Sequence, residues 1–218
     1  MKHDLDVMVD AGTVAARAAS YVAGLARAAV ADHGQFTFAV SGGRTPWAMF
    51  AELAGEDMPW AEVALFQVDE RVAPDGDPDR NLTHLRESIG DAPARVHPMP
   101  VTSPDLAAAA AAYATGLPQR FDLVHLGLGP DGHTASLVPG DPVLEVADAL
   151  VAVTQPYQGH RRMTLTYPAL ARADQLLWLI TGADKRDALG KLLAGDESIP
   201  AGRVLAARSL IMADEAAA

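Results

Sequence analysis

The sequence predicts an α/β protein: a mostly parallel, twisted sheet with helices on both faces, in a Rossmann-like three-layer architecture. Short apolar segments rich in β-branched and aromatic residues alternate with segments of helical pattern. The strand-like segments are nearly continuous in hydrophobicity, as expected for strands covered on both faces. No linker or shift in composition divides the 218 residues. We therefore expect a single domain over residues 1–218.

The first third of the chain predicts a helix, a strand and a second helix. Residues 13–33 are alanine-rich and free of proline, with Thr13 as a plausible N-cap and Gly34 as a helix-ending glycine. A short strand is expected over Phe36–Val40, where the chain reaches a glycine loop. The next helix begins near Pro46, because proline is tolerated in the first turn of a helix.

The remaining elements continue the alternation. A strand over residues 63–68 leads into a long polar loop at 69–81, and a short helix is expected over 82–89. A further helix is expected over 104–115, which contains six consecutive alanines. Strands are expected over 121–129 and 175–181, an alternating strand-like segment over 161–170, and a final helix over 182–193.

Composition and charge exclude several classes of function. The net charge is −11, which argues against nucleic acid as a partner because phosphate backbones require a basic surface. An anionic ligand would therefore need a locally basic pocket. The N-terminus carries charges where a signal peptide would be apolar, and no apolar window is long enough to span a bilayer. We expect a cytoplasmic protein without a membrane partner, and a monomer and a weak dimer both fit the sequence.

Metal chemistry is not expected. The chain has no cysteine, which excludes disulfides and thiolate sites. Its seven histidines include neither a close-spaced pair nor a HExxH motif.

Four polar loops follow predicted strands, and parallel strands bring such loops to one edge of the sheet, where ligands bind in open α/β folds. These loops are "SGGRTP" (41–46), "DERVAPDGDPDRN" (69–81), "GLGPDGHTASLVPG" (127–140) and "TGADK" (181–185). Their convergence is a stronger signal than any one motif.

The first loop has the features of an anion site. Gly42 and Gly43 allow backbone N–H groups to face a ligand, and the following helix adds the positive end of its dipole. Arg44 and Thr45 add side-chain donors. A simple tight turn is the alternative interpretation, and the spacing is not that of a P-loop.

Acid–base candidates lie in the second and third loops. Asp69 can accept hydrogen bonds from sugar hydroxyls or act as a base, and Arg71 can pair with phosphate, although a solvated loop start would also explain this charged triplet. His133 follows a strand end, with Asp131 two residues earlier to orient its ring, so it is a candidate general base. His125 lies inside an apolar strand and is interpreted as structural.

Further cations are candidates for the pocket. Arg161 and Arg162 open the segment "RRMTLTYPAL", where on a surface they would be unremarkable. Lys185 is one of only three lysines and lies near a helix start, where a cation is unfavourable with respect to the helix dipole.

Five segments, "SGGRTP", "DERVAPDGDPDRN", "GLGPDGHTASLVPG", "RMTLTYPAL" and "TGADK", together resemble the glucosamine-6-phosphate isomerase/6-phosphogluconolactonase family, in the family's order. The resemblance implies a parallel sheet flanked by helices, no cofactor, and hydrolysis of the δ-lactone of 6-phosphogluconate in the oxidative pentose phosphate pathway. It implies His133 as the general base and Asp69 and Arg71 in the sugar and phosphate pocket. It also implies residues 42–45 as the phosphate loop, with Arg162 and Lys185 as matching cations.

Two other functions compete with the lactonase interpretation. An aminosugar phosphate isomerase or deaminase of the same group would carry an acid shortly after the histidine, whereas residues 134–139 contain no carboxylate. A non-catalytic sugar-phosphate sensor would keep the glycine loop and the arginines, but would have no need of His133 or Asp69. The expected partner is thus a small sugar phosphate lactone.

Overall fold

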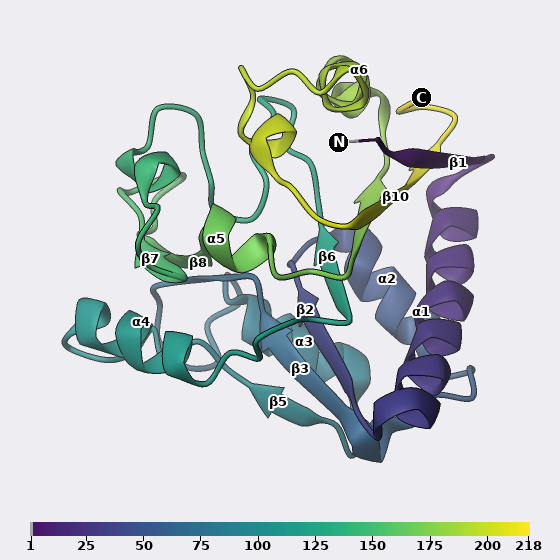
Figure 1. Cartoon of the computed structure of the whole chain (residues 1–218), viewed down its shortest axis with the longest axis horizontal. Coiled ribbons are helices and arrows are strands. Elements are labelled where there is room, and N and C mark those ends of the chain that lie inside the picture. Colours follow the sequence, from purple (N-terminus) through teal and green to yellow (C-terminus); the bar gives the residue numbers. More distant parts are fainter. Residues whose placement is uncertain (1) are drawn as a thin grey trace.

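The computed structural model describes residues 2–218, and its centre is a parallel sheet (Figure 1). Within these residues the sheet has seven strands in the spatial order β1-β10-β9-β6-β2-β3-β5, every pair parallel. The strands are β1 (Asp4–Met8), β2 (Phe36–Val40), β3 (Val63–Gln67), β5 (Arg95–His97), β6 (Leu123–Leu126), β9 (Gln175–Ile180) and β10 (Arg208–Asp214). The predicted mostly parallel α/β architecture is confirmed.

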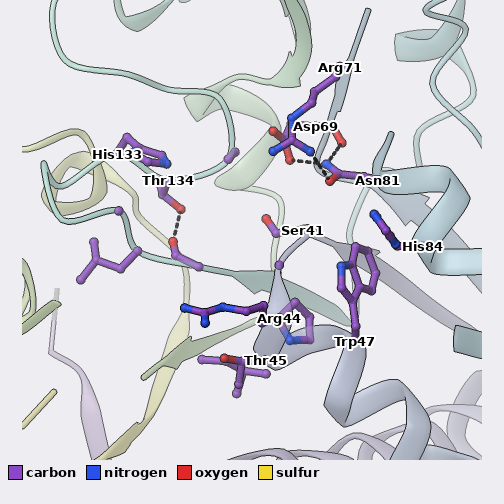
Figure 2. Close-up of a pocket in the computed structure, with 18 of the residues that line it drawn as sticks. Ser41, Arg44, Thr45, Trp47, Asp69, Arg71, Asn81, His84, His133 and Thr134 are labelled. Carbon is purple, nitrogen blue, oxygen red and sulfur yellow. Dashed lines mark hydrogen bonds between the residues drawn. The ribbon is translucent and has the colours of Figure 1, made fainter. Parts of the chain in front are cut away.

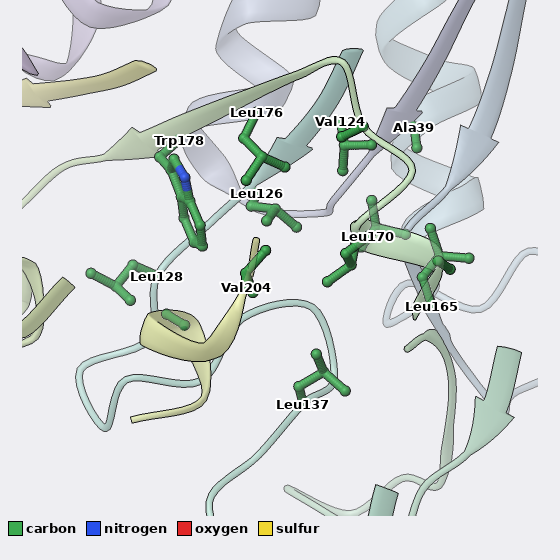
Figure 3. Close-up of a cluster of buried hydrophobic side chains, with 14 of the residues drawn as sticks. Ala39, Val124, Leu126, Leu128, Leu137, Leu165, Leu170, Leu176, Trp178 and Val204 are labelled. Atoms are coloured by element: carbon green, nitrogen blue, oxygen red, sulfur yellow. The ribbon is translucent and has the colours of Figure 1, made fainter. Parts of the chain in front are cut away.

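Helices cover both faces of this sheet, and each face has its own hydrophobic core. On one face lie α1 (Ala11–His33), α2 (Arg44–Leu53) and α3 (Asn81–Ile89), and on the other lie α4 (Leu106–Thr115), α5 (Tyr167–Leu170) and α6 (Arg186–Ala194). Strand β2 shows the division, because Phe38 belongs to the first core and its neighbour Ala39 to the second. Figure 3 shows the second core, which includes Trp178, Leu126 and Leu170.

The strands of the central sheet are buried because both of their faces are covered. Every residue of β2, β3, β6 and β9 is buried. This explains the near-continuous apolar character of these segments in the sequence. No helix within residues 2–218 is long and apolar enough to cross a bilayer.

A second, smaller sheet begins just beyond the carboxyl end of β3. It consists of β4 (Asp69–Arg71), β8 (Arg162–Leu165) and β7 (Val151–Val153), with antiparallel pairing in the order β4-β8-β7. The prediction of a loop over all of 69–81 is therefore wrong at its start. The charged triplet is a strand because β8 supplies hydrogen-bonding partners from a distant part of the chain, and this pairing sets Arg71 opposite Arg162.

Several predicted boundaries are also wrong. Helix α1 begins at Ala11 rather than at Thr13, because the carboxylate of Asp10 accepts a hydrogen bond from the Thr13 backbone N–H at 2.7 Å and caps the helix. Helix α4 begins at Leu106 rather than at residue 104, since Asp105 is its N-cap. The strand expected over 121–129 is shorter, and residues 127–129 belong to the loop that follows β6.

Strands β1 and β10 were not predicted. Strand β1 lies at the edge of the sheet and includes Asp4 and Asp6, so it lacks the apolar run of a central strand. It pairs with β10, more than 200 residues later along the chain. The charged N-terminal segment is thus a strand of the main sheet.

Candidate active site

A cavity of about 680 Å³ opens at the carboxyl ends of β2, β6 and β9. All four polar loops line it, as the convergence argument expected, and it also receives side chains from the small sheet and from helices α2 and α3. Nine of the ten predicted site residues line it: Gly42, Gly43, Arg44, Thr45, Asp69, Arg71, His133, Arg162 and Lys185. Asp131 is not in the lining and contacts His133 instead.

The glycine loop enters the cavity at the N-terminus of α2. Gly43 has φ 138°, a conformation that favours glycine, and it precedes the helix without any side-chain cap on the first turn. A Cβ on Gly42 would lie 2.0 Å from Oδ1 of Asn81, so only glycine fits there. Thr45 exchanges a hydrogen bond with Thr181 at 2.8 Å, which ties this loop to the end of β9. Exposed N–H groups at a helix N-terminus form an anion site.

His125, in the neighbouring strand β6, supports the glycine loop. The ring is fully buried in β6, and its Nδ1 accepts a hydrogen bond from the backbone N–H of Ser41 at 3.3 Å. Burial lowers the pKa of His125 to about 3, so the ring is neutral and able to accept. The structural interpretation of this histidine therefore agrees with its position.

Asp69 and Asn81 form one wall of the cavity, with Asn81 against the glycine loop (Figure 2). The Asp69 side chain is buried, and Ser136 donates from its hydroxyl to Oδ2 of Asp69 at 2.5 Å. Asn81 donates from Nδ2 to the Asp69 carbonyl oxygen at 3.0 Å. Burial raises the pKa of Asp69, and the hydrogen bond from Ser136 and the charge of Arg162 oppose that rise only in part.

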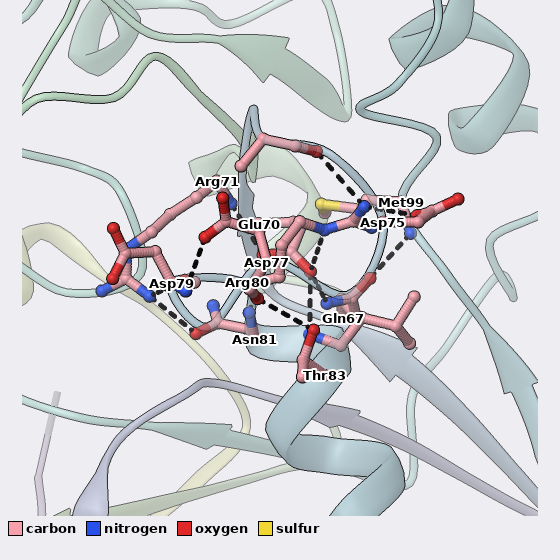
Figure 4. Close-up of polar contacts among 12 residues, drawn as sticks. Gln67, Glu70, Arg71, Asp75, Asp77, Asp79, Arg80, Asn81, Thr83 and Met99 are labelled. Carbon is pink, nitrogen blue, oxygen red and sulfur yellow. Dashed lines mark hydrogen bonds and ion pairs between the residues drawn. The ribbon is translucent and has the colours of Figure 1, made fainter.

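Glu70, between the two predicted residues of the charged triplet, anchors this wall from the protein interior (Figure 4). Its carboxylate accepts hydrogen bonds from the backbone N–H groups of Asn81 and Leu82, both at 2.8 Å, which caps α3. It also accepts from Nε2 of Gln67 at 2.9 Å and pairs with Nε of Arg80 at 3.2 Å. Losing one member of a buried ion pair costs about 3–5 kcal/mol. Glu70 therefore holds β4 against α3.

His133 and Asp131 form a hydrogen-bonded pair. The Nδ1 atom of His133 lies 2.5 Å from Oδ1 of Asp131, which also accepts from the His133 backbone N–H at 3.2 Å. Partial burial would raise the pKa of Asp131, but the hydrogen bonds from His133 outweigh it and keep that pKa below its ordinary value. An ionised carboxylate at Nδ1 requires the proton there, so Nε2 keeps the free lone pair.

The backbone of the third loop leaves room for this pair only because of glycine. A Cβ on Gly129 would lie 2.0 Å from Nδ1 of His133 and 2.6 Å from Oδ1 of Asp131. The hairpin-like turn also brings the N–H of Gly129 to the carbonyl of His133 at 2.8 Å. The ring of His133 is thus held on a rigid loop, and Figure 2 shows it across the cavity from Ser41 and Arg44.

The cations reach the cavity in different ways. Arg71 donates from Nη1 to the carbonyl of Asp79 at 2.7 Å and to Asn81 at 3.2 Å. Arg162 is buried, which lowers the pKa of its guanidinium. Lys185 pairs with Asp184 at 3.0 Å, in a short turn ahead of α6. Together with Arg44 they make a locally basic cavity in an acidic protein. The cavity therefore has the local positive charge that an anionic ligand of such a protein would need.

Sequence reasoning missed several residues that line or support the cavity. The lining also includes Ser41, Trp47, Asn81, His84, Gln158 and His160. Ser41 opens and Asn81 closes a quoted polar loop, so both had a detectable signal in the sequence. Trp47 and His84 come from helix faces, and Gln158 and His160 from a hairpin turn, whose positions only the tertiary structure defines. No group of three or more His, Asp or Glu residues within residues 2–218 is arranged to hold a metal ion.

The fold and the cavity together define an α/β protein with a basic cavity at the carboxyl edge of its sheet, where open α/β folds bind their ligands. The chain belongs to the family described as glucosamine-6-phosphate isomerases/6-phosphogluconolactonase, whose model matches residues 9–212.

Individual relatives agree with this assignment. The chain is 36% identical to a 6-phosphogluconolactonase of Synechocystis over 208 residues, covering 89% of this chain and 86% of the relative. A crystal structure of the 6-phosphogluconolactonase of Thermotoga maritima superposes with a TM-score of 0.88 at 26% identity, covering 98% of this chain and 100% of the other. A monomeric glucosamine-6-phosphate deaminase shares the fold, with a TM-score of 0.87 at 18% identity and 98% coverage of both chains. The fold alone therefore does not separate the two activities.

Proposed function

We propose that this protein hydrolyses 6-phospho-D-glucono-1,5-lactone to 6-phosphogluconate, the lactone-opening step of the oxidative pentose phosphate pathway, with His133 as the general base. The enzyme class follows from the family and from 36% identity to a 6-phosphogluconolactonase over most of the chain. The role of His133 rests on one observation. The ring of His133 and the loop of residues 42–45 line the same cavity.

The proposed reaction begins with binding of the phosphate by the glycine loop and the surrounding arginines. Binding this remote group orients C1 of the lactone against His133, which converts binding energy into positioning. Nε2 of His133 then takes a proton from a water molecule while the oxygen of that water attacks C1. Asp131 holds the proton on Nδ1 and stabilises the imidazolium that forms. When the tetrahedral intermediate collapses, the C1–O bond of the lactone ring breaks and Nε2 gives its proton to the departing ring oxygen. One positioned base contributes roughly 10²–10⁴-fold to the rate.

The tetrahedral intermediate carries an oxyanion, and we assign its donors to the backbone N–H groups of Thr134 and Ala135. Both residues line the cavity. The N–H groups of Gly129, Gly132 and His133 already have acceptors. Ala135 has φ 50°, a left-handed conformation that is strained for a residue other than glycine and that is often kept at functional sites.

The alternative function, an aminosugar phosphate isomerase or deaminase, lacks the acid that it would need shortly after the histidine. The first acid after His133 is Asp141, and both of its carboxylate oxygens are occupied outside the cavity, by the N–H groups of Val143 at 2.8 Å and Gln155 at 2.9 Å. A ring-opening relay that needs a second acid beside the histidine thus has no candidate in this loop. The presence of His133 and Asp69 in the cavity weighs against a pure sensor.

The test is an assay of lactone hydrolysis. Proton release from the phosphorylated lactone should exceed the spontaneous rate, and ammonia release from glucosamine 6-phosphate should stay at background. Preincubation with a chelator should leave the lactonase rate unchanged, because no residue of the proposed mechanism needs a metal. Ammonia release without lactone hydrolysis would reverse the assignment in favour of the deaminase, and neither activity would favour the sensor.

A further inference from the structure

The loop from Thr154 to Arg161 carries an aromatic residue that sequence reasoning passed over. Tyr157 and His160 form an antiparallel bridge around a two-residue turn, in which Gln158 has φ 49° and Gly159 has φ 86°. Positive φ at both central positions is the pattern of a type I′ turn, which is tight and well defined. The turn therefore fixes the position of the Tyr157 ring beside the cavity.

Tyr157 contacts three of the predicted site residues at once. Its hydroxyl donates to Oδ2 of Asp131 at 3.3 Å, while Oδ1 of the same carboxylate holds His133. Its ring lies against the ring of His133 in an edge-on arrangement, with centroids 5.7 Å apart. The guanidinium carbon of Arg162 lies 5.1 Å from the centroid of the Tyr157 ring.

Arg162 depends on this ring more than an ordinary arginine would. Within the described part of the chain its guanidinium makes no hydrogen bond, and its Nε is buried without a partner, while the Asp69 carboxylate acts on it only as a nearby opposite charge. A buried guanidinium with unpaired donors is costly, and an aromatic face lowers that cost through a cation–π contact. The ring of Tyr157 thus supports the guanidinium while leaving its donors available to a ligand.

We propose that Tyr157 is a positioning residue that holds the Asp131–His133 pair and Arg162 in fixed relation, so that the base and a substrate-binding cation face the lactone together. The inference rests on the proposed lactonase function and adds a residue to it. The hydroxyl fixes the carboxylate that orients the base, and the ring fixes the cation. Burial and the neighbouring Asp131 carboxylate raise the pKa of Tyr157, so the hydroxyl stays protonated and donates at neutral pH.

Two substitutions separate the two contacts. Tyr157→Phe keeps the ring and removes the hydrogen bond to Asp131. We expect kcat to fall about 2- to 10-fold, the worth of one hydrogen bond, with KM for the phosphorylated lactone unchanged. The acidic limb of the kcat/KM profile should also move to higher pH. An Asp131 carboxylate that has lost a donor is more basic, so the Asp131–His133 pair takes up a proton at a higher pH.

Tyr157→Leu removes the aromatic face as well. We expect the same loss of kcat together with a rise of about 2- to 30-fold in KM for the phosphorylated lactone, the range of a cation–π contact. The unphosphorylated lactone should show the loss of kcat without the added rise in KM, because Arg162 is assigned to the phosphorylated end.

The matched control is Tyr167→Phe. Tyr167 also donates one hydrogen bond, to the carbonyl of Pro200 at 3.0 Å, and lines a separate surface cavity beside Arg203. Kinetic constants and pH profile should be unchanged in this variant, and thermal melting should confirm that all three proteins fold. A Tyr157→Phe protein with wild-type kcat and pH profile would overturn the inference. Failure of the proposed function is distinct, since the wild-type protein itself would then lack lactonase activity.

Discussion

Ser136 and Asp69 join two segments that lie 67 residues apart in the chain, through a hydrogen bond from the serine hydroxyl to Oδ2 of the aspartate at 2.5 Å. Ser136 follows the histidine loop after β6, and Asp69 begins β4 of the small sheet. The contact attaches the loop of the proposed base to the wall that carries Arg71. It is also one of the few hydrogen bonds available to a buried carboxylate, whose charge is costly in this environment.

Replacing Asp69 by Asn should stabilise the protein and lower its activity. Burial raises the pKa of Asp69 above the unfolded value of 3.8, so stability falls as the pH rises from 3.8 to the folded pKa and stays at that lower level above it. Below pH 3.8 the carboxyl is neutral in both states and this cost vanishes. Asp69→Asn should therefore raise Tm at pH 7 more than at pH 4, while kcat/KM falls. The exposed Asp148→Asn variant is the control, and an equal change of Tm at both pH values would contradict the argument.

Replacing His133 by Ala should lower kcat/KM for lactone hydrolysis at least tens-fold, because the proposed base is lost. The fold should survive, since this loop histidine contributes little packing, and circular dichroism with thermal melting would verify it. His33→Ala is a suitable comparison, because His33 lies at the end of α1 and outside the cavity. Full activity of the His133→Ala protein would remove the general-base assignment.

Replacing Arg162 by Ala should act mainly on the phosphorylated substrate. Loss of hydrogen bonds to a charged group corresponds to about a 10- to 150-fold rise in KM for the phosphorylated lactone. Gluconolactone without phosphate should be affected much less. Arg161 is exposed and adjacent in sequence, so Arg161→Ala provides a matched control with near wild-type constants. Equal losses for both lactones would exclude a phosphate role for Arg162.

Replacing Gly129 by Ala should lower kcat by displacing the imidazole. The added Cβ would lie 2.0 Å from Nδ1 of His133, so the ring must move away from Asp131. A misplaced base costs up to about 10²-fold in rate. Gly190→Ala, in α6 with open space around the position of its Cβ, should leave kcat unchanged. Steady-state kinetics of both variants would decide the matter, and equal kcat values would show that the loop absorbs the methyl group.

The central part of the fold was predictable because local patterns carry it. Strands β2, β3, β6 and β9 are buried on both faces, and such strands read as nearly continuous apolar segments in the sequence. The alternation with helices then implies a parallel sheet, and a parallel sheet implies that the four polar loops meet at one edge. All ten predicted site residues were chosen by this argument and by the family resemblance, and nine of them line the cavity.

Other features depended on partners that no local pattern reveals. Strand β1 is a strand because β10 pairs with it from the far end of the chain, and Asp69–Arg71 is a strand because β8 supplies its hydrogen bonds. The placement of Tyr157 against His133 and Arg162 follows from a tight turn in a loop that resembles any other polar segment.

By itself, the sequence determined the class of fold, the family and the order of the polar loops, because hydrophobic periodicity and glycine placement act over a few residues. The tertiary structure decided which side chains touch: that Ser136 reaches Asp69, that Glu70 faces the interior and caps α3, and that Tyr157 lies between a base and a cation. These contacts join residues up to 67 positions apart. Their geometry arises only when sheet pairing and core packing have brought distant segments together.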